Sequence, residues 1–210
     1  MVKVAIIGAS GKSGQVILEE SIARGFEVTA IVRNKSKITK KVEIIEKDIH
    51  HLTRADLEGF DVVVNAFGST PGSESEHHVF GKKLIEELQG TKTRLIVVGG
   101  AGSLYVDEEK KIRLIDTEKF PKEYVPIASN QAKNLEDLKA SSGVNWTFIS
   151  PPAIFDPAGE KTGKFKLGKD NLIVNSKNEP YISYADYAIA LVDEIEQAKH
   201  LNTRFTVVSA

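Results

Sequence analysis

The sequence predicts an α/β fold: a single-domain, Rossmann-type, doubly wound parallel sheet with helices on both faces. Three observations predict it. Short β-branched runs alternate with helix-length amphipathic stretches along the chain, and such alternation gives parallel sheets because the crossovers are right-handed. A glycine-rich turn joins the first run to the first helical stretch. A length of 210 residues suits one domain, so we expect residues 1–210 to form a single unit.

The elements follow in order from this rhythm. Residues 2–7 form a nearly continuous apolar run, which is typical of a strand buried on both faces. Residues 12–24 carry apolar side chains at helical spacing and end at Gly25, which suits a left-handed helix terminus. Further strands are predicted at 26–32, 42–46, 61–65, 94–98, 145–150 and 204–208, and further helices at 74–88, 130–141 and 184–196.

Residues 156–180 interrupt the alternation. This segment is rich in Gly and Lys and contains two short strand-like pieces, KFKLG and LIVN. We expect it to form a small C-terminal, hairpin-like appendage near the substrate pocket.

Charge and composition exclude several classes of function. The chain has 28 Lys and Arg against 29 Asp and Glu, so it lacks the basic field that nucleic-acid or anionic-membrane binding needs. It has no cysteine, which excludes disulfides, zinc–thiolate sites and thiol catalysis. No apolar stretch reaches the length of a signal peptide or a membrane span. We expect a cytoplasmic monomer or weak homodimer without a metal site.

The segment GASGKSG at residues 8–14 predicts nucleotide binding, because it follows a buried strand and opens a helix. Gly8 permits a tight turn, Gly11 lets backbone amides approach a pyrophosphate, and Gly14 lets the helix pack on the strand. A P-loop is excluded because Ile6 stands where that motif needs its first glycine.

The end of the second predicted strand indicates which nicotinamide cofactor binds. NAD-selective sites usually have Asp or Glu there, whereas this chain has Arg33, whose guanidinium suits a 2′-phosphate. Ser10, Lys12 and Ser13 are placed to assist. We therefore predict NADP(H) in preference to NAD(H); the alternative is that Arg33 is an ordinary surface residue.

The ends of the other strands border the same crevice, which is where open parallel sheets bind ligands. After the third strand, Asp48 and Ile49 offer a carboxylate and an apolar wall to an adenine ring. The next two strands end in segments that let a cofactor lie against backbone: Ala66, Phe67, Gly68, Gly99 and Gly100.

No acid–base pair stands out. Ser103 is the one catalytic candidate, because a hydroxyl in the loop after the fifth strand could orient a substrate carbonyl. Ser129 and Lys133 lie one helical turn apart, but serine is a poorer proton donor than the tyrosine of a Tyr-x-x-x-Lys pair. The five histidines are expected to face solvent or cap helices. The absence of an acid–base pair favours hydride transfer to a flavin or a quinone, because the cofactors carry out that step and the protein mainly orients them.

Five segments carry a family resemblance: GASGKSG (8–14), VVGGAGSL (97–104), DTEKFPKEY (116–124), 146–168 and 182–196. Through them the chain resembles the atypical short-chain dehydrogenases/reductases of the NAD(P)H-binding group, which includes NmrA-like and biliverdin reductase B-like proteins, and within it the NADH-flavin reductases. The resemblance implies that Ser150, Pro151, Pro152 and Ala153 border the nicotinamide and that residues 182–186 position the last helix beneath the site.

Together these features predict an NAD(P)H-dependent reductase that passes hydride to a flat conjugated acceptor, such as a flavin or a quinone. A flavin would then be a substrate, stacked near residues 99–104 and 151–155. Two alternatives stay open: a non-catalytic NADP-binding redox sensor, and a nucleotide-sugar epimerase or dehydratase. The missing Tyr-x-x-x-Lys pair and the short C-terminal region disfavour the second alternative.

Overall fold

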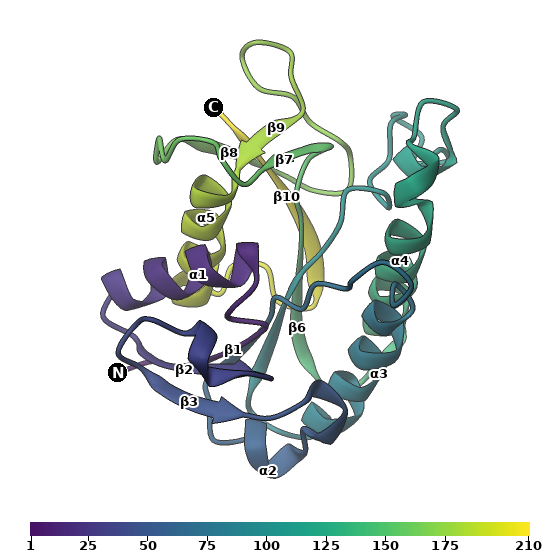
Figure 1. The fold of residues 1–210 in the computed structure, drawn as a ribbon. Helices are drawn as coiled ribbons and strands as arrows, with labels where there is room; N and C mark the ends of the chain where they lie inside the picture. Colours follow the sequence, from purple (N-terminus) through teal and green to yellow (C-terminus); the bar gives the residue numbers. More distant parts are fainter.

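The computed structural model describes residues 1–210 and contains one eight-stranded sheet (Figure 1). Its strands are β1 (Lys3–Ile7), β2 (Glu27–Val32), β3 (Glu43–Glu46), β4 (Val62–Asn65), β5 (Arg94–Val98), β6 (Asn145–Ser150), β8 (Phe165–Gly168) and β10 (Thr203–Ser209). They lie in the order β3-β2-β1-β4-β5-β6-β10-β8. Every pairing is parallel except that of β8 with β10.

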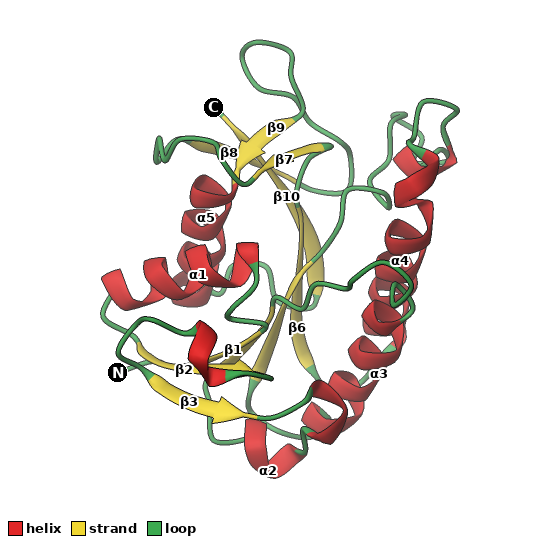
Figure 2. Ribbon diagram, in the orientation of Figure 1, coloured by secondary structure: helices red, strands yellow, loops and turns green.

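Helices cover both faces of the sheet, as Figure 2 shows. The helices are α1 (Lys12–Ala23), α2 (Arg54–Leu57), α3 (Glu76–Leu88), α4 (Val125–Ala140) and α5 (Tyr184–Gln197). α1 packs against α5 on one face, and α3 packs against α4 on the other. Because β1 is buried on both sides, Val4 and Ile6 face one apolar cluster while Ala5 and Ile7 face the other. The predicted α/β class is confirmed.

The centre of the sheet is where its connectivity reverses. β1 pairs with β2 on one side and with β4 on the other. The chain therefore winds outward from β1 through β2 to β3, and then crosses back to β4. The connections that follow β1 and β4 lead to α1 and α3 on opposite faces of the sheet. Such a point leaves a crevice at the carboxyl ends of the strands, the usual ligand site of open α/β sheets.

The segment 156–180 differs from the predicted hairpin. β8 pairs with the edge of β10, with Leu167 opposite Val207, and so extends the main sheet. A separate two-stranded parallel sheet joins β7 (Ile154–Asp156) to β9 (Tyr181–Ser183). The long free edge of β10 offers β8 a four-residue ladder, whereas LIVN forms no strand.

Two helices also differ from the prediction. α4 begins at Val125, before the predicted residue 130, and Pro126 lies in its first turn, where proline is tolerated. The short α2 was not predicted; Thr53 and Asp56 form a capping box at its start. No helix combines the length and the apolar character that crossing a bilayer would require.

Candidate functional site

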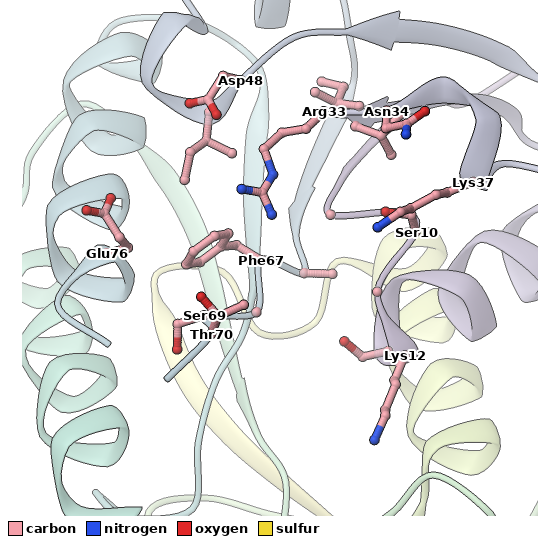
Figure 3. A pocket seen from close by; sticks show the side chains of 18 of the residues that line it. Ser10, Lys12, Arg33, Asn34, Lys37, Asp48, Phe67, Ser69, Thr70 and Glu76 are labelled. Atoms are coloured by element: carbon pink, nitrogen blue, oxygen red, sulfur yellow. The ribbon is translucent and has the colours of Figure 1, made fainter. Parts of the chain in front are cut away.

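A cavity of about 710 Å³ opens at the carboxyl ends of β1, β2, β3 and β4 (Figure 3). Many of the predicted cofactor-binding residues line it: Gly8, Ser10, Gly11, Lys12, Ser13, Arg33, Asp48, Ile49, Ala66, Phe67 and Gly68. The structure adds lining residues that the sequence did not single out as binding residues, among them Asn34, Lys37, Lys47, His50, Ser69, Thr70, Ser73, Glu76 and Tyr184.

The glycine-rich turn forms a tightly packed floor of this cavity. Gly8 has a φ of +76°, and a Cβ there would lie 2.6 Å from the carbonyl oxygen of Ala66. A Cβ on Gly14 would overlap the carbonyl oxygen of Gly8. The turn is also held by hydrogen bonds, from the Gly11 N–H to the Gly8 oxygen at 2.9 Å and from Gln15 Nε2 to the Ser10 oxygen at 3.1 Å. Only glycine at positions 8 and 14 allows this close approach.

The N-terminus of α1 points its free donors at the cavity. Gly11 caps the helix in an extended conformation and offers no side chain, and the first turn contains no acidic residue. The backbone N–H groups of Lys12 and Ser13 have no acceptor within the protein. Free amides and the positive end of the helix dipole make this terminus suited to an anionic group such as a phosphate.

One side of the cavity carries unpaired positive charge. No carboxylate lies within ion-pair distance of Lys12, Arg33 or Lys37, whereas Lys35 pairs with Glu46. Figure 3 shows Arg33 reaching from the end of β2 into the cavity, with Lys37 and Lys12 on the side nearer α1. Three cations without counterions, beside free helix amides, can together balance more than one negative charge on a ligand.

Lys37 reaches the cavity because the turn that carries it is ordered. Asn34 Oδ1 accepts a hydrogen bond from the Ser36 N–H at 2.9 Å, and Glu46 accepts one from the Lys35 N–H at 3.0 Å. A lysine-rich stretch such as residues 33–41 is ordinarily a solvated loop. Asn34, a residue type that favours capping a helical turn, was the signal that could have located Lys37.

The opposite side of the cavity is acidic and aromatic. Asp48 caps the turn at Ile49–His51 by accepting a hydrogen bond from the His50 N–H at 2.9 Å. One carboxylate oxygen of Glu76 lies 3.2 Å from His50 Nε2. The Phe67 ring packs edge-on against buried neighbours. Figure 3 shows it below the Arg33 guanidinium, with Glu76 on one side and Lys12 on the other. A flat base with an exocyclic amine could stack on Phe67 and donate hydrogen bonds to the carboxylates of Asp48 or Glu76.

Tyr184 lies in the segment 182–186 that the family resemblance singled out, and it lines the cavity from the start of α5. Its ring lies 3.9 Å from the ring of Phe155, centroid to centroid. Burial, together with the nearby negative charge of Asp156, raises the pKa of the Tyr184 phenol. The phenol therefore remains protonated at neutral pH.

The remaining predicted residues lie beside the cavity, at the ends of β5 and β6. A Cβ on Gly99 would overlap the ring of Phe148, and one on Gly100 would overlap the Gln131 side chain. These glycines therefore let the loop after β5 pack closely on its own protein. Ser103, Ser150, Pro151 and Pro152 are buried, and Ala153 is exposed. Their part in binding stays a prediction.

The histidines behave differently from one another. His50, His78 and His200 each lie within 3.2 Å of a carboxylate oxygen, and His51 is exposed. The expectation of a solvent-facing or capping role is wrong for His77, which is only 8% exposed. Its Nε2 accepts a hydrogen bond from the Ser69 N–H at 3.4 Å. Adjacent helix residues point about 100° apart, so one member of a His-His pair can face the core.

His77 should make the protein less stable in mild acid. Burial lowers its pKa from 6.5 to about 4, so the unfolded chain takes up a proton before the folded one does. The contribution of neutral His77 is complete above pH 6.5 and is lost as the pH falls towards 4, by about 3 kcal/mol in total. We expect His77→Gln to flatten this part of the stability profile.

Urea unfolding between pH 4 and 7 measures this effect. The matched control is His51→Gln, which removes an exposed histidine and should leave the profile parallel to that of the wild type. Parallel profiles for His77→Gln and the wild type would contradict the assignment.

Comparisons with known proteins agree with the geometry of the cavity. Residues 8–198 match the family model described as NAD(P)H-binding. The chain is 59% identical over 209 residues to the uncharacterized protein YwnB of Bacillus subtilis, covering 99% of this chain and 98% of that one.

Solved structures extend the comparison. SP1627 from Streptococcus pneumoniae TIGR4, provisionally named an NADH-flavin reductase, has a TM-score of 0.96 and 46% identity, with full coverage of both chains. A protein from Bacteroides thetaiotaomicron, provisionally named an epimerase, has a TM-score of 0.88 and 33% identity, covering 99% of this chain and 97% of that one. The chain therefore belongs to the NAD(P)H-binding family of Rossmann-fold, oxidoreductase-like proteins.

Proposed function

We propose that the protein is an NADPH-dependent reductase that transfers hydride to a flat conjugated acceptor, a flavin or a quinone. The observation that carries the proposal is the cationic side of the cavity. Lys12, Arg33 and Lys37 have no carboxylate partner there and stand beside the free amides at the start of α1. An NADH site would need an acidic residue at the end of β2 to hold the ribose hydroxyl, and this chain has Arg33 instead.

The lining residues fit the successive parts of NADPH. Arg33 and Lys37 would hold the 2′-phosphate, and the amides of Lys12 and Ser13 would hold the pyrophosphate. Phe67 and the acceptor oxygens opposite would bind the adenine ring and its amine. When bound, NADPH supplies a hydride from its nicotinamide ring.

The choice of acceptor rests on two supports. One is the name of the Streptococcus pneumoniae relative, an NADH-flavin reductase. The other is the absence of a Tyr-x-x-x-Lys pair. In its place the chain has Ser129 and Lys133, which do not line the cavity, and Lys133 is exposed. Flavins and quinones accept hydride without a strong protein acid, because the conjugated ring spreads the negative charge.

Binding and turnover can be tested on the purified 210-residue chain. Titration with NADPH and with NADH, followed by fluorescence, should show tighter binding of NADPH. Adding flavin mononucleotide or a benzoquinone should then bleach the absorbance of the reduced nicotinamide at a steady rate. Selective binding with no bleaching by any acceptor would reject the reductase and favour the redox sensor. Equal binding of both cofactors would reject the NADPH assignment.

A further inference from the structure

Arg204, in β10, is a buried charge that the proposed cofactor site does not use. Its side chain is 1% exposed, and its Nε donates a hydrogen bond to Asp170 Oδ1 at 2.9 Å. Burial alone would raise the pKa of Asp170, but hydrogen bonds from Arg204 and Lys110, together with their charges, outweigh burial and lower it. Only the arginine of this pair is fully buried, since the Asp170 side chain is 34% exposed. Burying the guanidinium charge is still expensive, so the pair is weak evidence of a purely stabilising role.

The free end of the guanidinium contacts two serine hydroxyls. Arg204 Nη1 donates to Ser103 Oγ at 3.2 Å and lies 3.5 Å from Ser150 Oγ. These serines follow or end the neighbouring strands β5 and β6. A guanidinium has donors only, so each hydroxyl accepts from Arg204 and keeps its own hydrogen. Neither hydroxyl donates that hydrogen to an acceptor in the protein.

The two serines differ in access. Ser150 is completely buried, whereas Ser103 is 8% exposed and lies in the loop after β5, at the carboxyl edge of the sheet. Of the two, only Ser103 keeps any exposed surface, so it is the serine that a ligand could reach. The adjacent positive charge polarises the Ser103 O–H bond and makes it a stronger donor than an isolated hydroxyl.

The backbone two residues after Ser103 is tied to the segment that contains Asp170. The Asp170 carbonyl oxygen accepts a hydrogen bond from the Tyr105 N–H at 2.9 Å, and the Tyr105 carbonyl oxygen accepts one from the Leu172 N–H at 2.8 Å. Arg204 thus anchors the segment that carries Ser103 against residues 169–172. The donor is held in place before any ligand arrives, which is what electrostatic preorganisation requires.

We propose that Arg204 is a positioning residue for hydride transfer: it fixes the Ser103 hydroxyl as a hydrogen-bond donor to the carbonyl oxygen of the acceptor. The inference rests on the proposed reductase function. With a flavin, the C4–H bond of the reduced nicotinamide breaks and an N5–H bond forms on the flavin. The electron pair moves towards N1 and the C2 carbonyl oxygen, and water later supplies the proton at N1. Ser103 donates to the oxygen on which this charge develops.

A double-mutant cycle tests the link between the two residues. Ser103→Ala should slow single-turnover reduction of flavin mononucleotide about 100-fold, the lower end of the usual loss for one such donor. Arg204→Lys should slow it to a similar extent, and the double variant should be no slower than Ser103→Ala, because one residue acts through the other. Ser103→Thr, which keeps the hydroxyl, should restore most of the rate.

Two further measurements separate positioning from general damage. The dissociation constant of oxidised flavin mononucleotide, measured by flavin fluorescence without NADPH, should rise non-additively in the same cycle, while NADPH affinity stays unchanged. Arg94→Lys is the matched control: Arg94 is a second buried arginine, paired with Glu194 at the amino-terminal edge of the sheet. The Arg94→Lys variant should have a lower free energy of unfolding than the wild type and the same rate of hydride transfer. If Arg204→Lys does not fold, Asp170→Asn takes its place in the cycle.

The outcomes distinguish this inference from the function on which it rests. Suppose that the wild type turns over normally and the rate losses of the two single variants multiply in the double variant. That result, or a Ser103→Ala variant as fast as the wild type, would overturn the role of Arg204 and leave the reductase proposal intact. A wild-type protein that binds NADPH but reduces no acceptor would overturn both.

Discussion

Replacing Arg33 with alanine should raise the dissociation constant for NADPH about tenfold or more and leave that for NADH nearly unchanged. A hydrogen bond to a charged group contributes about 1.5–3 kcal/mol, and the lower end applies because Arg33 is exposed. The two cofactors differ only in the 2′-phosphate, so a contact with that group appears only in NADPH binding. The measurement is a fluorescence titration of the variant with each cofactor.

Lys35→Ala is the matched control for Arg33→Ala. Lys35 carries the same charge two residues further on, but it pairs with Glu46 and does not line the cavity. Its loss should leave both affinities within about twofold of the wild type. Added salt should shrink the Arg33 effect, because exposed charges are screened. An equal fall in both affinities, or none, would refute the assignment of Arg33 to the 2′-phosphate.

Gly14→Ala should abolish cofactor binding and lower the free energy of unfolding by about 2–3 kcal/mol, the usual range for overpacking. The new Cβ would overlap the carbonyl oxygen of Gly8 and lie 2.9 Å from the Cα of Ala9. Both neighbours are backbone, so relief requires moving the turn that presents the amides of α1. Urea unfolding and NADPH titration measure the two effects.

Gly59→Ala provides the control, since a Cβ there meets no atom within 4 Å and the backbone is not in the left-handed region. This variant should bind NADPH normally and unfold at the same urea concentration as the wild type, or slightly above it. A Gly14→Ala protein that kept wild-type stability and NADPH affinity would show that the close approach of helix and turn is not needed.

Local patterns predicted the part of the molecule built from consecutive residues. The apolar run of β1, the glycine turn and α1 adjoin in sequence, so their arrangement could be read directly, and Gly8 and Arg33 line the cavity as expected. The order of strands around β1 then placed the crevice, because the carboxyl ends of parallel strands share one edge.

The parts that could not be predicted depend on contacts between distant segments. Lys37 has no sequence signal of its own and lines the cavity only because its turn borders it. Glu76 and Tyr184 reach the cavity from helices far along the chain. The pairing of Arg204 with Ser103 spans 101 residues. No periodicity in either segment indicates this contact, since it depends on β10 pairing with β6, the neighbour of β5.

The edge position of β8 affects how prone the protein is to aggregate during folding. β10 is a seven-residue strand rich in β-branched and aromatic side chains, the composition most prone to pairing with other chains. In the folded protein β8 covers its free edge and presents instead a shorter strand that contains Lys166. The other edge, β3, has only four residues and carries Glu43 and Glu46. Aggregation should therefore begin from molecules in which β8 has not yet docked, and variants that loosen residues 165–168 should aggregate at concentrations the native chain tolerates.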